Sequence, residues 1–163
     1  MNLVNIYFTN MIELNFTKSK YKSEVLELIN RNVLSRYIKK RCGNRMVNLN
    51  YNFISSKEQI KMNREFKNHN YNTDILTFDL SNQACELTGE VYISLKQVKK
   101  NAKRYHVSLK EELNRVLIHG FLHLSDYNDE TKQEKRDMRR QEDKYLKYIK
   151  RKCSTWNMSI NHY

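Results

Sequence analysis

Proline is absent from this sequence of 163 residues, and glycine occurs only three times. Linkers between domains are usually rich in glycine, serine or proline, and no such segment interrupts this chain. No internal repeat is present either. We therefore expect one continuous domain over residues 1–152, followed by a C-terminal tail over residues 153–163.

Cysteine is also scarce. The three cysteines, Cys42, Cys85 and Cys153, are odd in number and far apart in the sequence. This spacing argues against a disulfide framework and against a close pair of metal-binding thiols. We expect three free thiols, with Cys42 or Cys85 only a remote alternative as a metal ligand.

Long apolar runs are missing as well. No segment approaches the roughly 18–20 apolar residues that a membrane-spanning helix needs. The first sixteen residues lack the basic region followed by an apolar region that marks a signal peptide. We therefore expect a cytoplasmic protein that has no membrane partner.

Acidic residues are few relative to basic ones. Thirty lysines and arginines face eighteen aspartates and glutamates, which gives a formal net charge of +12 and a pI near 9.6. Such a charge attracts polyanions and favours a nucleic acid as partner. The chain is also rich in lysine, asparagine, isoleucine and tyrosine, and a drift toward A+T-rich codons would raise the charge without any selected partner. Composition alone leaves both interpretations open.

The spacing of apolar residues predicts the order of strands and helices. Apolar and polar residues alternate from Val47 to Phe53, which indicates a strand with one buried face. Apolar residues from Tyr21 to Ile38 recur in steps of three and four, which predicts one amphipathic helix that stops at Gly43. We expect strands at about residues 4–8, 47–53, 74–80 and 91–93, and helices at about residues 19–41, 60–66, 94–102, 108–124 and 130–151. The irregular order predicts the α+β class, a small mixed β-sheet packed with several helices.

Two capping boxes mark the starts of helices in this scheme. Ser94 and Gln97 form one box, and Ser108 and Glu111 form the other. The helix that begins after Ser108 is central to the functional interpretation, because it carries the candidate metal site.

Two histidines on this central helix are spaced to bind one metal ion. His119 and His123 are four residues apart, so both imidazoles project from the same face of the helix. Asp129 follows six residues later, and a turn after the helix would bring its carboxylate back toward the pair. Three protein ligands leave a coordination position open for water, as a catalytic metal requires. We expect one divalent ion, with zinc as the first choice and nickel or manganese as alternatives.

The same ligand spacing occurs in the HExxHxxGxxH metalloproteases, where a glutamate after the first histidine is the general base. Here that position is Gly120, which cannot transfer a proton. The glycine of their turn is replaced by Asp126, a residue that tolerates the left-handed conformation better than most. A metalloprotease-like hydrolase is therefore a weaker alternative.

Several other polar residues are not assigned to the site. His69, His106 and His162 have no partner at ligand spacing, and we expect them in loops or at the surface. Asp74 could order a group near the metal, but an acidic residue at the start of a strand is more often structural.

Four segments resemble the YbeY family of endoribonucleases, also described as rRNA maturation factors. HGFLHLSDYND, at residues 119–129, resembles the family signature HGxLHLxGYxH. MNREFKNHNYNTDILTFDL, GEVYIS and DMRRQED resemble three further segments of the family. The resemblance runs in the family's own order from about Val47 to Leu146.

The resemblance implies a metal-dependent endoribonuclease that is specific for single-stranded RNA and acts in 16S rRNA 3′-end maturation and ribosome quality control. It implies a metal-dependent hydrolase domain over residues 1–152, rRNA as partner, and small-subunit ribosomal proteins as further candidates. It also implies that Lys67 occupies the position of the family's functional arginine and neutralises charge on the phosphate. The general base stays unassigned.

Three residues depart from the family pattern. Asp129 replaces a common histidine ligand, and Asp126 replaces the signature glycine. Lys67 replaces the arginine, which keeps the charge but loses the bidentate geometry that matches a phosphate. The last change favours an alternative function, a non-catalytic ribosome assembly factor with a structural metal. A plain nucleic-acid-binding module does not account for the three ligands.

Overall fold

A mixed sheet of four strands, in the order β1-β2-β4-β3, organises the structure, which is a computed structural model. The structure describes residues 11–17, 19–67 and 74–153. The first three strands in this order are parallel, and β3 runs antiparallel to β4 at the sheet edge. The strands are β1 (Met11–Phe16), β2 (Met46–Ile54), β3 (Ile75–Asp79) and β4 (Glu86–Ser94). The helices are α1 (Ser19–Leu28), α2 (Arg31–Cys42), α3 (Ser56–Lys67), α4 (Leu95–Tyr105), α5 (Leu109–His123) and α6 (Lys132–Lys152).

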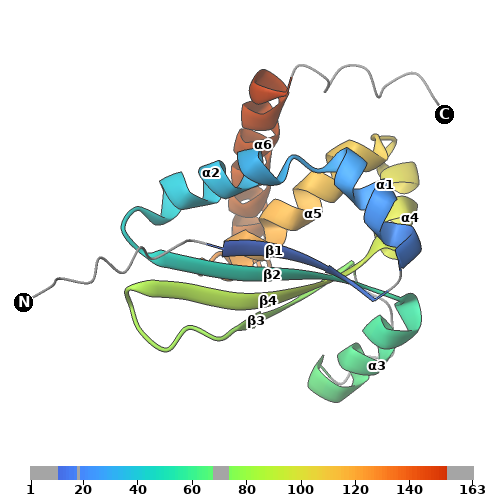
Figure 1. Cartoon of the computed structure of the whole chain (residues 1–163), viewed down its shortest axis with the longest axis horizontal. Helices are drawn as coiled ribbons and strands as arrows, with labels where there is room; N and C mark the ends of the chain where they lie inside the picture. The colour runs from blue at the N-terminus through green and yellow to red at the C-terminus, as the bar shows by residue number, and fades with distance from the viewer. Residues whose placement is uncertain (1–10, 18, 68–73, 154–163) are drawn as a thin grey trace, which may run out of the picture.

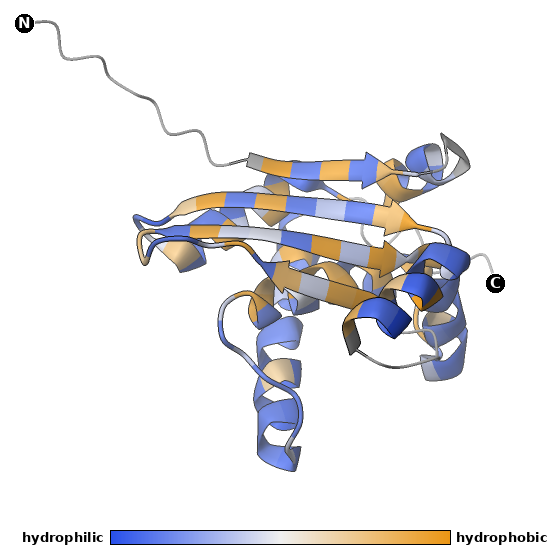
Figure 2. Cartoon of the chain, turned by 90° about the horizontal axis from the view of Figure 1, so that it is seen from below, coloured by the Kyte–Doolittle hydropathy of each residue, from blue (hydrophilic) through white to orange (hydrophobic). Residues whose placement is uncertain are grey.

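The helices α1, α2 and α5 lie on one face of this sheet, where α4 and α6 pack against α5, whereas α3 lies at one end of the other face (Figure 1). Apolar and polar residues alternate along the strands (Figure 2), and the apolar ones on β2 and β4 are buried under the helices. This two-layer arrangement confirms the predicted α+β class. No helix in the described ranges is long and apolar enough to cross a membrane.

The N-terminal part differs from the sequence prediction. The single helix predicted at 19–41 is wrong, because the chain forms α1 and α2 with a break at Asn30. The Asn30 side chain accepts a hydrogen bond from the Val33 backbone N–H and so caps α2, which a continuous helix would not allow. Gly43 ends α2 at a φ of 60°, as predicted. The strand predicted at 4–8 lies outside the described residues, and β1 was not predicted.

The predicted capping boxes are only partly present. The Ser108 hydroxyl accepts from the Glu111 N–H at 3.1 Å and caps α5 as expected. Ser94 precedes α4, but its side chain makes no capping hydrogen bond, so that prediction is wrong. A complete box that was not predicted begins α6, where Thr131 and Glu134 each bond the other's backbone N–H.

The helix α5 is the most buried helix of the fold, because it lies between the sheet and its neighbours α4 and α6. Gly120 brings it close to the sheet. A Cβ atom at residue 120 would lie 2.7 Å from Ile75 Cδ1 and 2.8 Å from Val91 Cγ1. The position at which metalloproteases carry their glutamate therefore has no room for any side chain here.

We expect Gly120→Ala to destabilise the protein by about 1–3 kcal/mol, because overpacking outweighs the better helix propensity of alanine. Chemical denaturation would measure the difference. Lys147→Ala on the exposed side of α6 is the matched control and should change stability by less than about 0.5 kcal/mol. A Gly120→Ala protein as stable as the wild type would show that α5 does not pack this closely on the sheet.

Candidate metal centre

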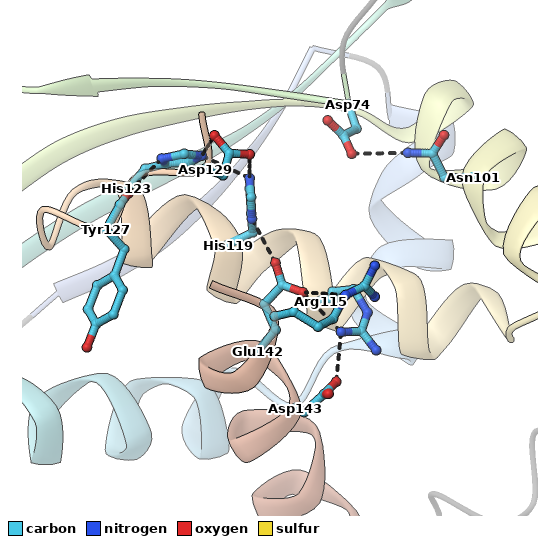
Figure 3. Close-up of polar contacts among 10 residues, drawn as sticks. Asp74, Asn101, Arg115, His119, His123, Tyr127, Asp129, Glu142 and Asp143 are labelled. Atoms are coloured by element: carbon cyan, nitrogen blue, oxygen red, sulfur yellow. Dashed lines mark hydrogen bonds and ion pairs between the residues drawn. The ribbon is translucent and has the colours of Figure 1, made fainter. Parts of the chain in front are cut away.

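The last turn of α5 and the loop after it bring His119, His123 and Asp129 together (Figure 3). The two Nε2 atoms are 2.9 Å apart. The Asp129 carboxylate places one oxygen 3.8 Å from His119 Nε2 and the other 3.9 Å from His123 Nε2. The three predicted ligands are therefore neighbours in space, each of them partly buried.

These distances fit one small ion among the three side chains. Zinc binds imidazole nitrogen at about 2.0–2.1 Å in tetrahedral geometry, so two nitrogens on one ion lie roughly 3.3 Å apart. The observed separations of 2.9, 3.8 and 3.9 Å lie on either side of that value. Two imidazoles and a carboxylate are also a donor set that zinc accepts. The residues present therefore fit a divalent ion and could hold it.

The other nitrogen of each ring is bound by a group that fixes the ring's tautomer. His123 Nδ1 lies 3.0 Å from the Tyr127 carbonyl oxygen, which can only accept, so Nδ1 carries the proton. His119 Nδ1 lies 2.8 Å from Glu142 Oε1. Both Nε2 atoms are then lone-pair donors that point at the same space. Metal-binding histidines commonly show this arrangement, with the second nitrogen held by a carboxylate or a carbonyl.

Glu142 on α6 connects His119 to Arg115. Its Oε1 accepts from His119, and its Oε2 accepts from Arg115 Nη1 at 3.0 Å. Burial alone would raise the pKa of Glu142, but the hydrogen bonds and charges of His119 and Arg115 outweigh it and lower the pKa. Glu142 is therefore a carboxylate, which confirms that His119 Nδ1 is the donor. Arg115 also binds Asp143 at 2.9 Å, so two acidic groups hold its guanidinium in place.

The electrostatic environment of His119 favours a cation beside its ring. Burial alone would lower the pKa of His119. The Glu142 hydrogen bond and the negative charges of Glu142, Asp74 and Asp129 outweigh burial and raise that pKa. Without a metal this favours a proton on the ring, and the same negative charges favour a divalent ion in its place.

A turn at Asp126 returns the chain to the histidines. Asp126 adopts a φ of 65°, the left-handed conformation expected at this position. The turn is closed by the Tyr127 N–H, which donates to the Leu122 carbonyl at 3.0 Å. Consequently the Tyr127 carbonyl reaches His123, and Asp129 follows two residues later.

Three residues of this centre were missed by sequence reasoning. Glu142 and Arg115 were not proposed, although Glu142 lies in a segment that resembles the family. Asp74 was judged structural, yet it lines the cleft beside His119 and raises the pKa of that ring. The Asn101 amide donates to Asp74 Oδ2 at 3.0 Å and holds the carboxylate at this wall.

The other residues considered in the sequence, namely Lys67, the remaining histidines and the cysteines, either are not part of this centre or lie outside the part of the chain that the structure describes. Lys67 is the last residue of α3, and its side chain is not among the atoms described. His106 follows the last residue of α4 and caps the helix in a left-handed conformation, whereas His69 and His162 lie outside the described residues. Cys42, Cys85 and Cys153 are free thiols, as expected, and none belongs to the metal group.

The turn at Asp126 gives a stability prediction. Alanine in the left-handed conformation costs about 1–2 kcal/mol, whereas glycine adopts it freely. We therefore expect Asp126→Ala to unfold more easily than Asp126→Gly by about 1 kcal/mol. Thermal unfolding of the two variants side by side would measure the difference. Equal stability would argue against a left-handed residue 126.

Comparison with known proteins places this centre in a family. The model described as Endoribonuclease YbeY matches residues 10–150. The endoribonuclease YbeY of Cytophaga hutchinsonii is 46% identical over 101 residues, covering 62% of this chain and 71% of that protein. The endoribonuclease YbeY of Parabacteroides distasonis is 33% identical over 138 residues, covering 82% of this chain and 96% of that protein.

A solved structure shares the fold. The solution structure of a Thermotoga maritima protein matches with a TM-score of 0.62 and 27% identity, over 85% of this chain and 89% of that one. The extent of the family match and the full-length relative confirm the resemblance seen in the sequence. This chain belongs to the endoribonuclease YbeY family.

Proposed function

We propose that the protein is a metal-dependent endoribonuclease that cleaves single-stranded RNA, acting in 16S rRNA 3′-end maturation and ribosome quality control. The observation that carries the proposal is the convergence of two Nε2 lone pairs and the Asp129 carboxylate on one point. Family membership supports RNA as the substrate. The catalytic domain would comprise residues 1–152, with a tail at 153–163, in a cytoplasmic protein.

The chemistry fits hydrolysis of a phosphodiester. A divalent ion such as zinc, held by His119, His123 and Asp129, would supply Lewis-acid activation of the phosphate and of the attacking water. Glu142 and the Tyr127 carbonyl each accept a hydrogen bond from an Nδ1 atom and keep the two rings oriented, so both Nε2 atoms face the position that the ion would take. Three protein ligands leave room for water or substrate in the ion's coordination sphere.

A second candidate function follows from the substitution at residue 67. Lysine keeps the positive charge of the family's arginine, but it cannot form two parallel hydrogen bonds to a phosphate. The same centre would then hold a structural metal in a non-catalytic assembly factor that binds rRNA, with small-subunit ribosomal proteins as possible neighbours. RNA cleavage by the zinc-loaded protein separates the two functions, because only the endoribonuclease would cleave.

We expect the zinc affinity to depend on the charge of Glu142. Glu142→Gln should weaken zinc binding about 10- to 100-fold, because groups that orient metal-binding histidines contribute about this much. Competition with a chromophoric chelator would measure it. Asp143→Asn is the matched control, since Asp143 also binds Arg115 but not the histidines. Equal losses in both variants would mean that Glu142 acts only through Arg115.

We expect the zinc-loaded protein to cleave end-labelled single-stranded RNA, and a chelator to abolish cleavage. His123→Ala should abolish cleavage but leave RNA affinity intact, because it removes one metal ligand and no lysine or arginine. Purifying this variant in parallel controls for contaminating nuclease. A variant that unfolds would indicate a structural metal, and cleavage equal to that of the wild type would refute the nuclease assignment.

Lys67 provides a test of the phosphate-binding proposal. Lys67→Ala should reduce the cleavage rate about 100-fold or more without changing zinc affinity, if the lysine stabilises charge in the transition state. Lys67→Arg should retain or increase activity. If Lys67→Ala cleaves as fast as the wild type, residue 67 has no catalytic role.

A further inference from the structure

A cleft of about 650 Å³ extends from the metal centre along α5 and is larger than three metal ligands require. His119 and Asp129 line it at the metal centre. Tyr105 of α4 and Asp74 line one part of the cleft, and residues of α6 line another. The helix α5 packs against both α4 and α6 (Figure 1) and contributes Glu112, Arg115 and Val116 to the lining between them. A chain-like ligand could therefore continue from the metal centre into this cleft.

Three basic residues of α6 line the cleft. Lys135, Arg136 and Arg139 are exposed, and steps of one and four residues place them on one side of the helix. Arg139 is 59% exposed, and its Nε lies 3.9 Å from the nearest carboxylate oxygen, that of Glu142. The neighbouring Arg140 instead forms an ion pair with Asp137. The cleft side of α6 therefore presents cationic groups to solvent.

Four acidic residues also line the cleft, and one of them, Asp74, accepts a hydrogen bond from Asn101. Glu142 is bound by Arg115 and His119. Glu112 is only 3% exposed, and burial raises its pKa, which favours the neutral form. Asp129 belongs to the metal centre. The three basic side chains of α6 are exposed whereas Glu112 and Glu142 are buried, so an anion that approaches α6 from solvent meets these cations before those two carboxylates.

An aromatic side chain adds a second recognition element. Tyr105 ends α4, is 54% exposed, and lines the same cleft. Exposed aromatic rings next to basic residues are typical of sites that bind single-stranded nucleic acid, because any base can stack on the ring. A polyanion without bases would gain nothing from this ring.

We propose that this cleft binds the RNA strand beside the cleaved bond: Lys135, Arg136 and Arg139 contact backbone phosphates, and Tyr105 stacks on a base. The position of the cleaved bond rests on the proposed function, whereas the binding itself requires no metal. Single-stranded RNA carries both the phosphates that these three basic side chains can bind and the bases that can stack on Tyr105.

The test is binding of a fluorescent single-stranded RNA to the full-length protein in chelator, where cleavage cannot occur. The cleft variant is the triple substitution Lys135→Ala, Arg136→Ala, Arg139→Ala. It should bind at least about tenfold more weakly, and its log–log salt slope should be shallower by about 2, since each phosphate contact to a single strand contributes about 0.7. The charge-conserving variant Lys135→Arg, Arg136→Lys, Arg139→Lys should bind this RNA about as tightly as the wild type does.

A matched control carries the same change in charge in the C-terminal half of α6, away from the cleft. Lys144, Lys147 and Arg151 are exposed there and do not line the cleft, and their replacement by alanine should weaken binding no more than about threefold. Unchanged thermal unfolding and zinc affinity would show that both triple variants are folded. Equal loss of affinity in the two variants would overturn the proposal, because binding would then follow net charge alone.

Tyr105 separates RNA from other polyanions. Tyr105→Leu should lower RNA affinity by roughly fivefold or more, whereas Tyr105→Phe should not, because the ring does the stacking. Neither variant should change binding of inorganic polyphosphate. If Tyr105→Leu weakens the binding of polyphosphate as much as that of RNA, or weakens the binding of neither ligand, the stacking assignment is wrong.

Binding and cleavage together distinguish this inference from the proposed function. If the zinc-loaded protein cleaves RNA but the cleft variant matches its control in RNA affinity and KM, the inference fails and the nuclease function stands. If binding depends on the cleft but no RNA is cleaved, the inference stands for a non-catalytic RNA-binding protein and the nuclease function fails.

Discussion

The candidate metal centre depends on two protons, one on the Nδ1 atom of each histidine. His119 and His123 each use Nδ1 as a donor, to Glu142 and to the Tyr127 carbonyl, and this leaves two Nε2 lone pairs 2.9 Å apart. Two lone pairs at that distance repel each other unless a proton or a metal ion lies between or beside them, and the negative charges that raise the pKa of His119 favour either one. The packing of α5 against α6 holds the two rings and Glu142 in place and offsets the free-energy cost of this contact. A bound cation then turns a repulsive contact into a stabilising one.

The fold supplies the rigidity that this centre needs. Gly120 lies between the two histidines in sequence and about a quarter of a turn from them around α5, where it permits close contact with Ile75 and Val91. The buried hydroxyl of Tyr51 on β2 donates to the Leu117 carbonyl at 3.1 Å and ties the same helix to the sheet. The candidate ligands therefore project from a helix that its packing on the sheet holds in place. The cleft lies beside them, and the basic residues of α6 that line it are exposed to solvent.

The sequence predicted features that depend on local periodicity, and missed those that depend on packing between elements. His119 and His123 were predictable because helical spacing alone places them on one face. Glu142 lies 23 residues from His119 and reaches it only because α6 packs on α5. A signal was present, since Glu142 falls on the buried stripe between Met138 and Tyr145, where a charged residue needs a partner. The break at Asn30 was likewise signalled by a good capping residue within an apparently continuous pattern.

X-ray absorption at the zinc edge of the loaded protein would show whether His119, His123 and Asp129 bind the ion, because it reports the atoms bound to the metal without relying on activity. We expect one zinc per chain with two imidazole ligands, oxygen for the remaining positions, and no sulfur. His123→Ala should lose one imidazole contribution and keep the other. Sulfur ligation, fewer than two imidazoles in the wild type, or an unchanged spectrum in His123→Ala would contradict this expectation.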